Sequence, residues 1–188
     1  LAAGNAFILK PSEETPLTAN ALAAICREAG MPDGLFQVLH GDHVIGQAIC
    51  AHRGITKVSL TGGVDTGKLI VAQSAASLKK VTLELGGKAP LLVFADADFD
   101  KAVSMAARAA FTNQGQICLC GSRIFVERPI YEKFKEEFVK RTQFLKIGDP
   151  ASPITDLGAL VSRSHMDKVM SYIELAKVEG GTVLTGGT

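Results

Sequence analysis

Short apolar runs alternate with longer amphipathic segments along most of the chain. Six runs rich in Val, Ile, Leu and Phe are typical of short buried strands. They lie at residues 6–10, 35–39, 57–60, 81–85, 91–94 and 123–127, and a further strand-like run covers 182–184. The apolar spacing predicts helices at 16–29, 42–49, 66–77, 98–111, 130–141 and 163–179. Strands separated by helices imply crossover connections, so we predict an α/β fold with a parallel, open sheet.

The first predicted helix has recognisable signals at both ends. Thr15 is suited to the N-cap and Pro16 to the first helical position. Gly30 is placed to end the helix, and Pro32 follows directly. We therefore expect this helix to lie between Thr15 and Gly30.

The strand–helix alternation is interrupted once, by the glycine- and proline-containing segment 86–90. We take this interruption as a domain boundary and predict domains at 1–86 and 87–188. The chain begins at Leu1 in mid-pattern and stops directly after the run 182–184. Both ends therefore suggest a fragment of a longer protein.

Composition and charge exclude several classes of function. The chain has 188 residues, with 47% hydrophobic and 21% charged, which is ordinary for a globular protein. Lys and Arg number 20 against 19 Asp and Glu, so the net charge of +1 predicts neither nucleic-acid nor membrane binding. No apolar run approaches the roughly 20 residues that span a bilayer. No secretory signal is present at the start, so we expect a cytoplasmic protein.

Four cysteines, Cys26, Cys50, Cys118 and Cys120, do not form a disulfide framework in a chain of this size. A reducing compartment is the better expectation. Cys118 and Cys120 lack a second Cys or His pair at the spacing of a zinc site, so we predict no metal.

A glycine-rich turn joins the strand at 57–60 to the following helix. Gly62, Gly67 and Lys68 nearly match the P-loop of nucleotide hydrolases, but Leu69 stands where that motif requires Ser or Thr. The Gly-x-Gly-x-x-Gly dinucleotide motif is also absent. Backbone N–H groups at such a turn suit a phosphate or pyrophosphate. A plain strand-to-helix turn remains the alternative.

The segment 10–13 follows the first predicted strand directly. Ligands of parallel sheets gather at the carboxyl ends of strands. Lys10 could donate hydrogen bonds to ribose hydroxyls there, and Glu13 could accept them. The alternative is a solvated loop that carries a charged pair.

Cys118 lies among turn-forming residues after the helix at 98–111, and Glu84 lies in the strand at 81–85. A thiol and a carboxylate at the ends of ordered elements are suited to act as nucleophile and general base. A free cysteine that packs as a small apolar residue is the alternative for Cys118.

These segments together resemble the aldehyde dehydrogenase superfamily. The resemblance covers essentially the whole chain in order, and the Glu-Leu-Gly-Gly and Gly-Gln-x-Cys segments are its most specific parts. The matching residues are Lys10-Pro-Ser-Glu13, Thr15-Pro-Leu17, Glu28-Ala-Gly30, Thr61-Gly-Gly63, Gly67, Val81 to Lys88, Asn113 to Gln116, Cys118 and Gly121-Ser-Arg123.

The resemblance implies a Rossmann-like cofactor domain in residues 1–86 and the first part of an α/β catalytic domain in 87–188. It implies that Cys118 attacks an aldehyde to form a thiohemiacetal and then a thioester, while Glu84 acts as general base. It also implies NAD as cofactor, because Glu13 would repel the 2′-phosphate of NADP. The implied cofactor-binding residues are Lys10, Pro11, Ser12, Glu13, Gly41, Thr61, Gly62, Gly63, Gly67, Leu85 and Gly86.

The residues around the nucleophile, 117–126, resemble the branch that oxidises 2-aminomuconic or hydroxymuconic semialdehydes. Betaine aldehyde and succinate semialdehyde remain open as substrates. Many members carry Ser where Gly63 stands, and Cys120 replaces a frequent Ala. The resemblance implies a homodimer or homotetramer and an inactive isolated fragment. The alternatives from other classes are a P-loop-like nucleotide hydrolase and a non-catalytic structural derivative of the fold.

Overall fold

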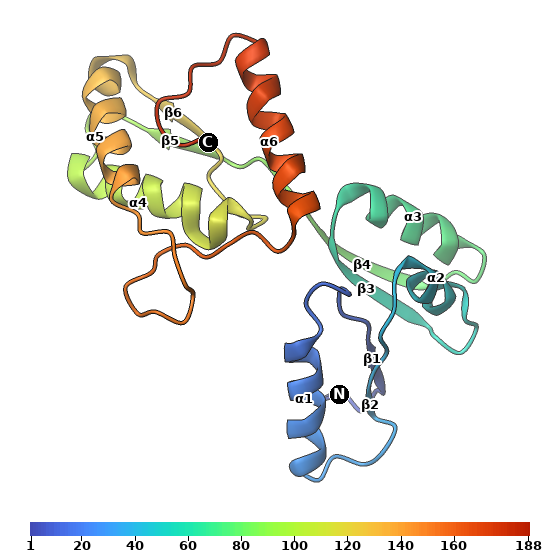
Figure 1. Cartoon of the computed structure of the whole chain (residues 1–188). Helices are drawn as coiled ribbons and strands as arrows, with labels where there is room; N and C mark the ends of the chain where they lie inside the picture. Colours follow the sequence, from blue (N-terminus) through green and yellow to red (C-terminus); the bar gives the residue numbers. More distant parts are fainter. The chain divides into compact units, whose positions relative to one another are not determined.

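The computed structural model describes residues 1–188, and contacts within the chain separate it into two units. The first unit comprises Leu1–Leu85 and the second Gly86–Thr188. Each unit alternates strands and helices, and every strand pair is parallel (Figure 1). The predicted α/β class with parallel strands is confirmed. The strands form three separate two-stranded sheets, in the order β1–β2, β3–β4 and β5–β6.

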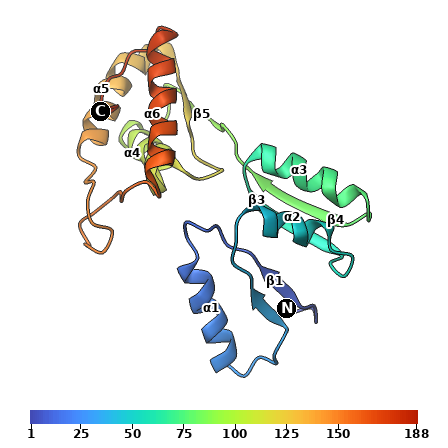
Figure 2. The ribbon, with the colours of Figure 1, turned by 45° about the vertical axis from the view of Figure 1, so that its right-hand side comes forward.

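The first unit contains four strands and three helices. They are β1 (Phe7–Leu9), α1 (Leu17–Glu28), β2 (Phe36–Val38), α2 (His43–Ala51), β3 (Lys57–Gly62), α3 (Val64–Ala75) and β4 (Lys80–Leu85). Helix α3 packs along the β3–β4 pair (Figure 2). The close approach is possible because Gly67 has no side chain, since a Cβ there would lie 3.0 Å from the Leu85 side chain.

The sequence predicted the C-terminal end of α1 correctly but not its N-terminal cap. Pro16 occupies the N-cap position and no side chain caps the helix, so the predicted Thr15 cap is wrong. At the other end, Gly30 has φ +80°, and its N–H donates to the Arg27 carbonyl. The N–H of Met31 donates to the Cys26 carbonyl, which completes a Schellman motif. The predicted helix end at Gly30 is confirmed.

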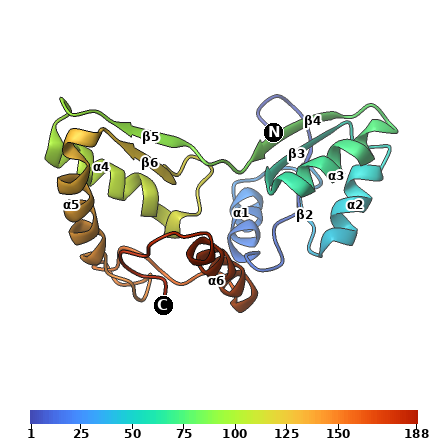
Figure 3. The ribbon, with the colours of Figure 1, turned by 90° about the horizontal axis from the view of Figure 1, so that it is seen from above.

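The second unit contains β5 (Pro90–Val93), α4 (Phe99–Phe111), a short irregular turn (Thr112–Gly115), β6 (Arg123–Val126), a 3₁₀ turn (Arg128–Ile130), α5 (Tyr131–Gln143) and α6 (Arg163–Val178). Its core is formed where α4 and α5 meet one face of the β5–β6 pair (Figure 3). Val93, Val103, Ala106 and Phe134 are buried there. This core fixes the ends of α4 and β6, between which Cys118 lies.

The strand predicted at 182–184 does not form. A strand needs a neighbour for its backbone hydrogen bonds, and this segment pairs with none. Glycines on both sides of it also favour irregular backbone. No helix of the chain has the length and apolar character needed to cross a membrane.

Candidate functional site

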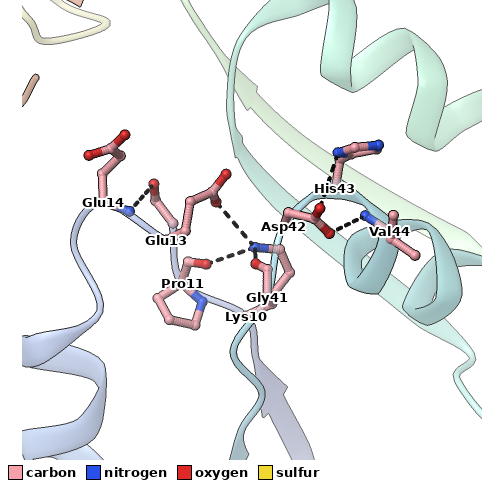
Figure 4. Close-up of polar contacts among 9 residues, drawn as sticks. Lys10, Pro11, Glu13, Glu14, Gly41, Asp42, His43 and Val44 are labelled. Carbon is pink, nitrogen blue, oxygen red and sulfur yellow. Dashed lines mark hydrogen bonds and ion pairs between the residues drawn. The ribbon is translucent and has the colours of Figure 1, made fainter. Parts of the chain in front are cut away.

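Lys10 joins the end of β1 to the start of α2 (Figure 4). Its Nζ donates hydrogen bonds to the carbonyls of Pro11, at 2.8 Å, and Gly41, at 2.6 Å. The Glu13 carboxylate lies 3.9 Å from the same Nζ. The Lys10 side chain is only 19% exposed, whereas that of Glu13 is 61% exposed. Lys10 is therefore held in place, with one N–H still free, and Glu13 presents an open carboxylate.

The backbone that receives Lys10 depends on Gly41. Gly41 has φ +142°, and a Cβ at this position would collide with the Ile45 side chain one turn into α2. Asp42 then caps the helix, because its Oδ1 accepts a hydrogen bond from the Val44 N–H at 2.9 Å. The glycine allows the chain to turn sharply into α2 while its carbonyl points to Lys10.

We therefore predict that Gly41→Ala lowers the free energy of unfolding by about 2–4 kcal/mol, through backbone strain and crowding against Ile45. Gly46→Ala is the matched control. Gly46 lies inside the same helix, and a Cβ there meets only the end of the Lys10 side chain, at 3.7 Å. That change should be neutral or stabilising by up to about 1 kcal/mol. Urea unfolding of both variants provides the comparison, and equal stabilities would contradict this account of Gly41.

The glycine-rich turn between β3 and α3 leaves the backbone at the start of α3 uncovered. Thr61 and Gly62 end β3, and Gly63 is the N-cap of α3 with φ −74° and ψ 152°. No atom lies within 4 Å of the position that a Gly63 Cβ would take, and no side chain caps the helix. The first N–H groups of α3 are thus accessible to an anion such as a pyrophosphate. Because this space is open, a Ser side chain would fit at position 63, and crowding does not explain the glycine there.

Glu84 and Leu85 lie beside this turn at the end of β4. Glu84 is in register with Thr61, and Leu85 with Gly62. Strand alternation turns the Glu84 side chain to the exposed face, while Leu85 points toward Gly67 of α3. The Glu84 carboxylate makes no hydrogen bond or ion pair within the chain. It is therefore open to contact with a ligand or water.

All the predicted cofactor residues except Gly86 lie in the first unit. Gly86 is the first residue of the second unit. Pro11, Ser12 and Gly41 surround the Lys10 side chain or its loop, and Thr61, Gly62, Gly63 and Gly67 surround the start of α3. Gly86 also has no atom within 4 Å of a Cβ position. A free ammonium N–H, an open carboxylate and an uncapped helix start fit a dinucleotide, which carries ribose hydroxyls and a pyrophosphate.

Cys118 lies on an exposed, strained loop between α4 and β6. Asn113 and Gln114 have φ of 52° and 56°, which is uncommon for residues with a Cβ. Cys118 is exposed and free, whereas Cys120, two residues later, is buried. The N–H of Cys118 makes no hydrogen bond within the chain. The loop therefore presents both a thiol and a backbone donor to a ligand.

Segment 86–88 packs against this loop, a contact that sequence reasoning missed. A Cβ on Gly87 would lie 3.2 Å from the Cys118 carbonyl oxygen. The Nε of Arg123 donates a hydrogen bond to the Lys88 carbonyl at 2.8 Å, just beyond the β5–β6 register. Two glycines in succession are the only sequence signal for such a close backbone approach.

The remaining cysteines have a different character. Burial raises the pKa of the Cys50 thiol, and the nearby charge of Lys79 only partly offsets this. Cys50 is 3% exposed, so its thiol is both protonated and inaccessible. Cys118 is exposed, Cys26 is half-buried, and Cys50 and Cys120 are buried. No three His, Cys, Asp or Glu side chains gather in a way that could hold a metal ion.

Comparison with known proteins gives one consistent result. The sequence pattern of the Aldehyde dehydrogenase family matches residues 1–188. The betaine aldehyde dehydrogenase of Vibrio vulnificus (strain YJ016) is 53% identical over 187 residues, which are 100% of this chain and 38% of that protein. The 4-trimethylaminobutyraldehyde dehydrogenase A of Danio rerio is 50% identical over 100% of this chain and 37% of its own length. The chain spans less than two fifths of these relatives.

Solved structures agree with the sequence relatives. PnpE in complex with nicotinamide adenine dinucleotide superposes with a TM-score of 0.97 at 42% identity, over 100% of this chain and 39% of that one. The betaine aldehyde dehydrogenase of Staphylococcus aureus in complex with NAD+ superposes with a TM-score of 0.96 at 37% identity. The superposition includes 100% of this chain and 37% of that protein.

Proposed function

Since the chain belongs to the aldehyde dehydrogenase family, we propose that the full-length protein uses NAD to oxidise an aldehyde to a carboxylic acid. The observation that carries this proposal is the exposed Cys118 thiol on its strained loop, since the other three cysteines are half-buried or buried. The carboxylate of Glu84, which has no partner within the chain, supports the assignment of a general base.

Cys118 performs the first step. Its sulfur, in the thiolate form, attacks the aldehyde carbonyl carbon, and the carbonyl π electrons move to oxygen, which gives the thiohemiacetal anion. The free N–H of Cys118 is a donor for the negative oxygen, and such donors often supply the largest part of transition-state stabilisation. Bound NAD supplies the acceptor for the hydride that leaves this carbon. The carbon remains on Cys118 as a thioester.

Glu84 performs the second step. Its carboxylate removes a proton from water as the water oxygen attacks the thioester carbonyl, and the Cys118 sulfur then leaves with its bonding electrons. The products are the carboxylic acid and the restored thiolate. A positioned general base of this kind contributes about 10²–10⁴-fold to a rate.

Each unit has its own part in this proposal. Residues 1–86 form part of the NAD-binding domain, in which Lys10 and Glu13 hold ribose hydroxyls and the N-terminus of α3 holds the pyrophosphate. Residues 87–188 form part of the catalytic domain, which carries the nucleophile. A homodimer or homotetramer and a cytoplasmic location remain predictions for the full-length protein.

For the substrate, the relatives favour betaine aldehyde over the muconic semialdehydes. The muconic prediction depended on residues 117–126. Part of that stretch packs inward: Cys120 is 6% exposed, and Ile124 and Val126 pack against the core of the second unit, whereas Leu119 and Phe125 are exposed. The inward-facing members of the stretch therefore reflect packing rather than substrate recognition. We propose an aldehyde that carries a quaternary ammonium group.

The test is a comparison of kcat/KM values for the full-length protein with NAD. The panel contains betaine aldehyde, 4-trimethylaminobutyraldehyde, succinate semialdehyde and 2-aminomuconic semialdehyde. We expect the two trimethylammonium aldehydes to exceed the others by at least about tenfold, a difference of about 1.4 kcal/mol in transition-state binding. A higher value for either semialdehyde would reject the substrate assignment, and no NADH formation with any aldehyde would reject the proposed function.

The preference for NAD is predicted to depend on Glu13. Glu13→Gln removes the negative charge that disfavours a 2′-phosphate, so the ratio of kcat/KM for NAD to that for NADP should fall about tenfold. Glu14→Gln is the matched control, because the neighbouring Glu14 side chain is exposed and makes no ion pair. Equal ratios in both variants would show that Glu13 does not select the cofactor.

A further inference from the structure

We propose that His165 is a positioning residue for Cys118 and that it acts through the side chain of Gln116. This inference rests on the proposed role of Cys118 as nucleophile. His165 lies 47 residues beyond Cys118 in the sequence, on α6. It belongs to none of the motifs that identify the site.

A hydrogen bond joins α6 to the nucleophile loop. The Nε2 of His165 lies 2.9 Å from the Oε1 of Gln116, two residues before Cys118. The backbone of His165 is itself fixed, because its N–H donates to the Oγ of Ser162, the N-cap of α6. His165 is half-buried, so its ring is held from the first turn of a regular helix.

The loop needs such an anchor because its backbone is strained. Asn113, Gln114 and Gly115 follow one another with φ of 52°, 56° and 71°. For residues with a Cβ, such conformations cost about 1–3 kcal/mol each and persist only where surrounding contacts hold them. Within the loop, the Gln116 N–H donates to the Asn113 carbonyl at 3.0 Å and the Asn113 Nδ2 donates to the Gln116 carbonyl at 3.4 Å. Asn113 and Cys118 are nevertheless exposed, so little packing supports these bonds and a contact from outside the loop adds to them.

Both glutamines of this loop reach the same segment. The Nε2 of Gln114 lies against Gly158, 3.3 Å from where a Cβ would stand, and Gln116 meets His165. Segment 158–165 therefore lies beside both glutamines, and its hydrogen bond to the loop is the one between His165 and Gln116. Because only Ile117 separates Gln116 from Cys118, a shift at Gln116 moves the thiol directly.

The experiment compares His165→Ala with His165→Gln in the full-length protein, since a glutamine amide can replace the Nε2–H donor. Two readouts are measured: hydrogen–deuterium exchange of residues 112–122, and the kinetics with aldehyde and NAD. The matched control is Lys168→Ala, one turn further along the exposed side of α6. Gln116→Leu and the double variant His165→Ala/Gln116→Leu complete a double-mutant cycle.

We expect His165→Ala to speed exchange in 112–122 and to lower kcat/KM for the aldehyde about tenfold, with KM for NAD unchanged. His165→Gln should restore both to within about threefold, and Lys168→Ala should resemble wild type. The double variant should be no worse than Gln116→Leu alone. Wild-type exchange in His165→Ala, no rescue by glutamine, or multiplying effects in the double variant would each overturn the proposal.

The exchange measurement needs no turnover. If the wild-type protein oxidises no aldehyde, the proposed function fails while loop exchange still decides whether His165 anchors the loop.

Discussion

Replacing Cys118 by alanine is expected to lower aldehyde oxidation by at least about 10⁴-fold, because the covalent route through a thioester is lost entirely. The substitution should leave the fold intact. The Cys118 side chain is exposed and the residue lies outside the hydrophobic core, so its removal creates no cavity. NADH formation by the full-length variant, followed by absorbance with saturating aldehyde, measures the loss.

Cys120→Ala is the control for this prediction. Cys120 is only two residues away but buried, and its sulfur serves packing. The variant should keep activity within about threefold while losing roughly 1 kcal/mol of stability, as expected for the loss of a small buried side chain. If Cys120→Ala were inactive and Cys118→Ala active, the nucleophile would have been assigned to the wrong thiol.

Replacing Glu84 by glutamine is expected to lower steady-state kcat by about 10²–10⁴-fold while sparing the first turnover. The thioester can form without activated water, so each active site should release about one NADH in a rapid burst and then stall. The change should not disturb β4, because the Glu84 carboxylate is exposed and has no partner to lose.

Thr82→Ala is the matched control for Glu84, because Thr82 lies two residues earlier on the same exposed face of β4. It should retain wild-type kcat with no burst. Rapid-mixing absorbance at the NADH band separates the two phases. A Glu84→Gln variant with wild-type kcat, or one with neither burst nor turnover, would remove Glu84 from the role of hydrolytic base.

The secondary structure was largely predictable, because apolar periodicity and helix-ending residues act over short stretches of sequence. Apolar periodicity located all six strands and all six helices, and Gly30 marked the end of α1 because only a residue without Cβ adopts φ +80° freely. The two failures, the Thr15 cap and the strand at 182–184, have different reasons. Pro16 takes the cap position itself, and a strand without a pairing neighbour cannot form.

For the site, the sequence predicted residues but not the contacts between them. Lys10 and Glu13 could be placed at the end of a strand, whereas the hydrogen bond from Lys10 to the Gly41 carbonyl spans 31 residues. The same holds for His165 and Gln116, 49 residues apart, and for Gly87 against the Cys118 carbonyl. Periodicity carries no information about such long-range pairs. For the substrate, the residues beside Cys118 resembled the muconic semialdehyde branch, whereas the relatives over the whole chain favour the betaine aldehyde alternative.

Trapping the acyl group shows whether Cys118 is the residue that carries it. The full-length Glu84→Gln variant is mixed with NAD and betaine aldehyde, quenched in acid and digested with trypsin. Cleavage after Arg108 and Arg123 releases residues 109–123, which contain both Cys118 and Cys120. We predict that fragment-ion mass spectrometry places the acyl mass on Cys118 in proportion to the NADH burst. An acyl mass on Cys120, or a full NADH burst with no acyl mass on this peptide, would contradict the account.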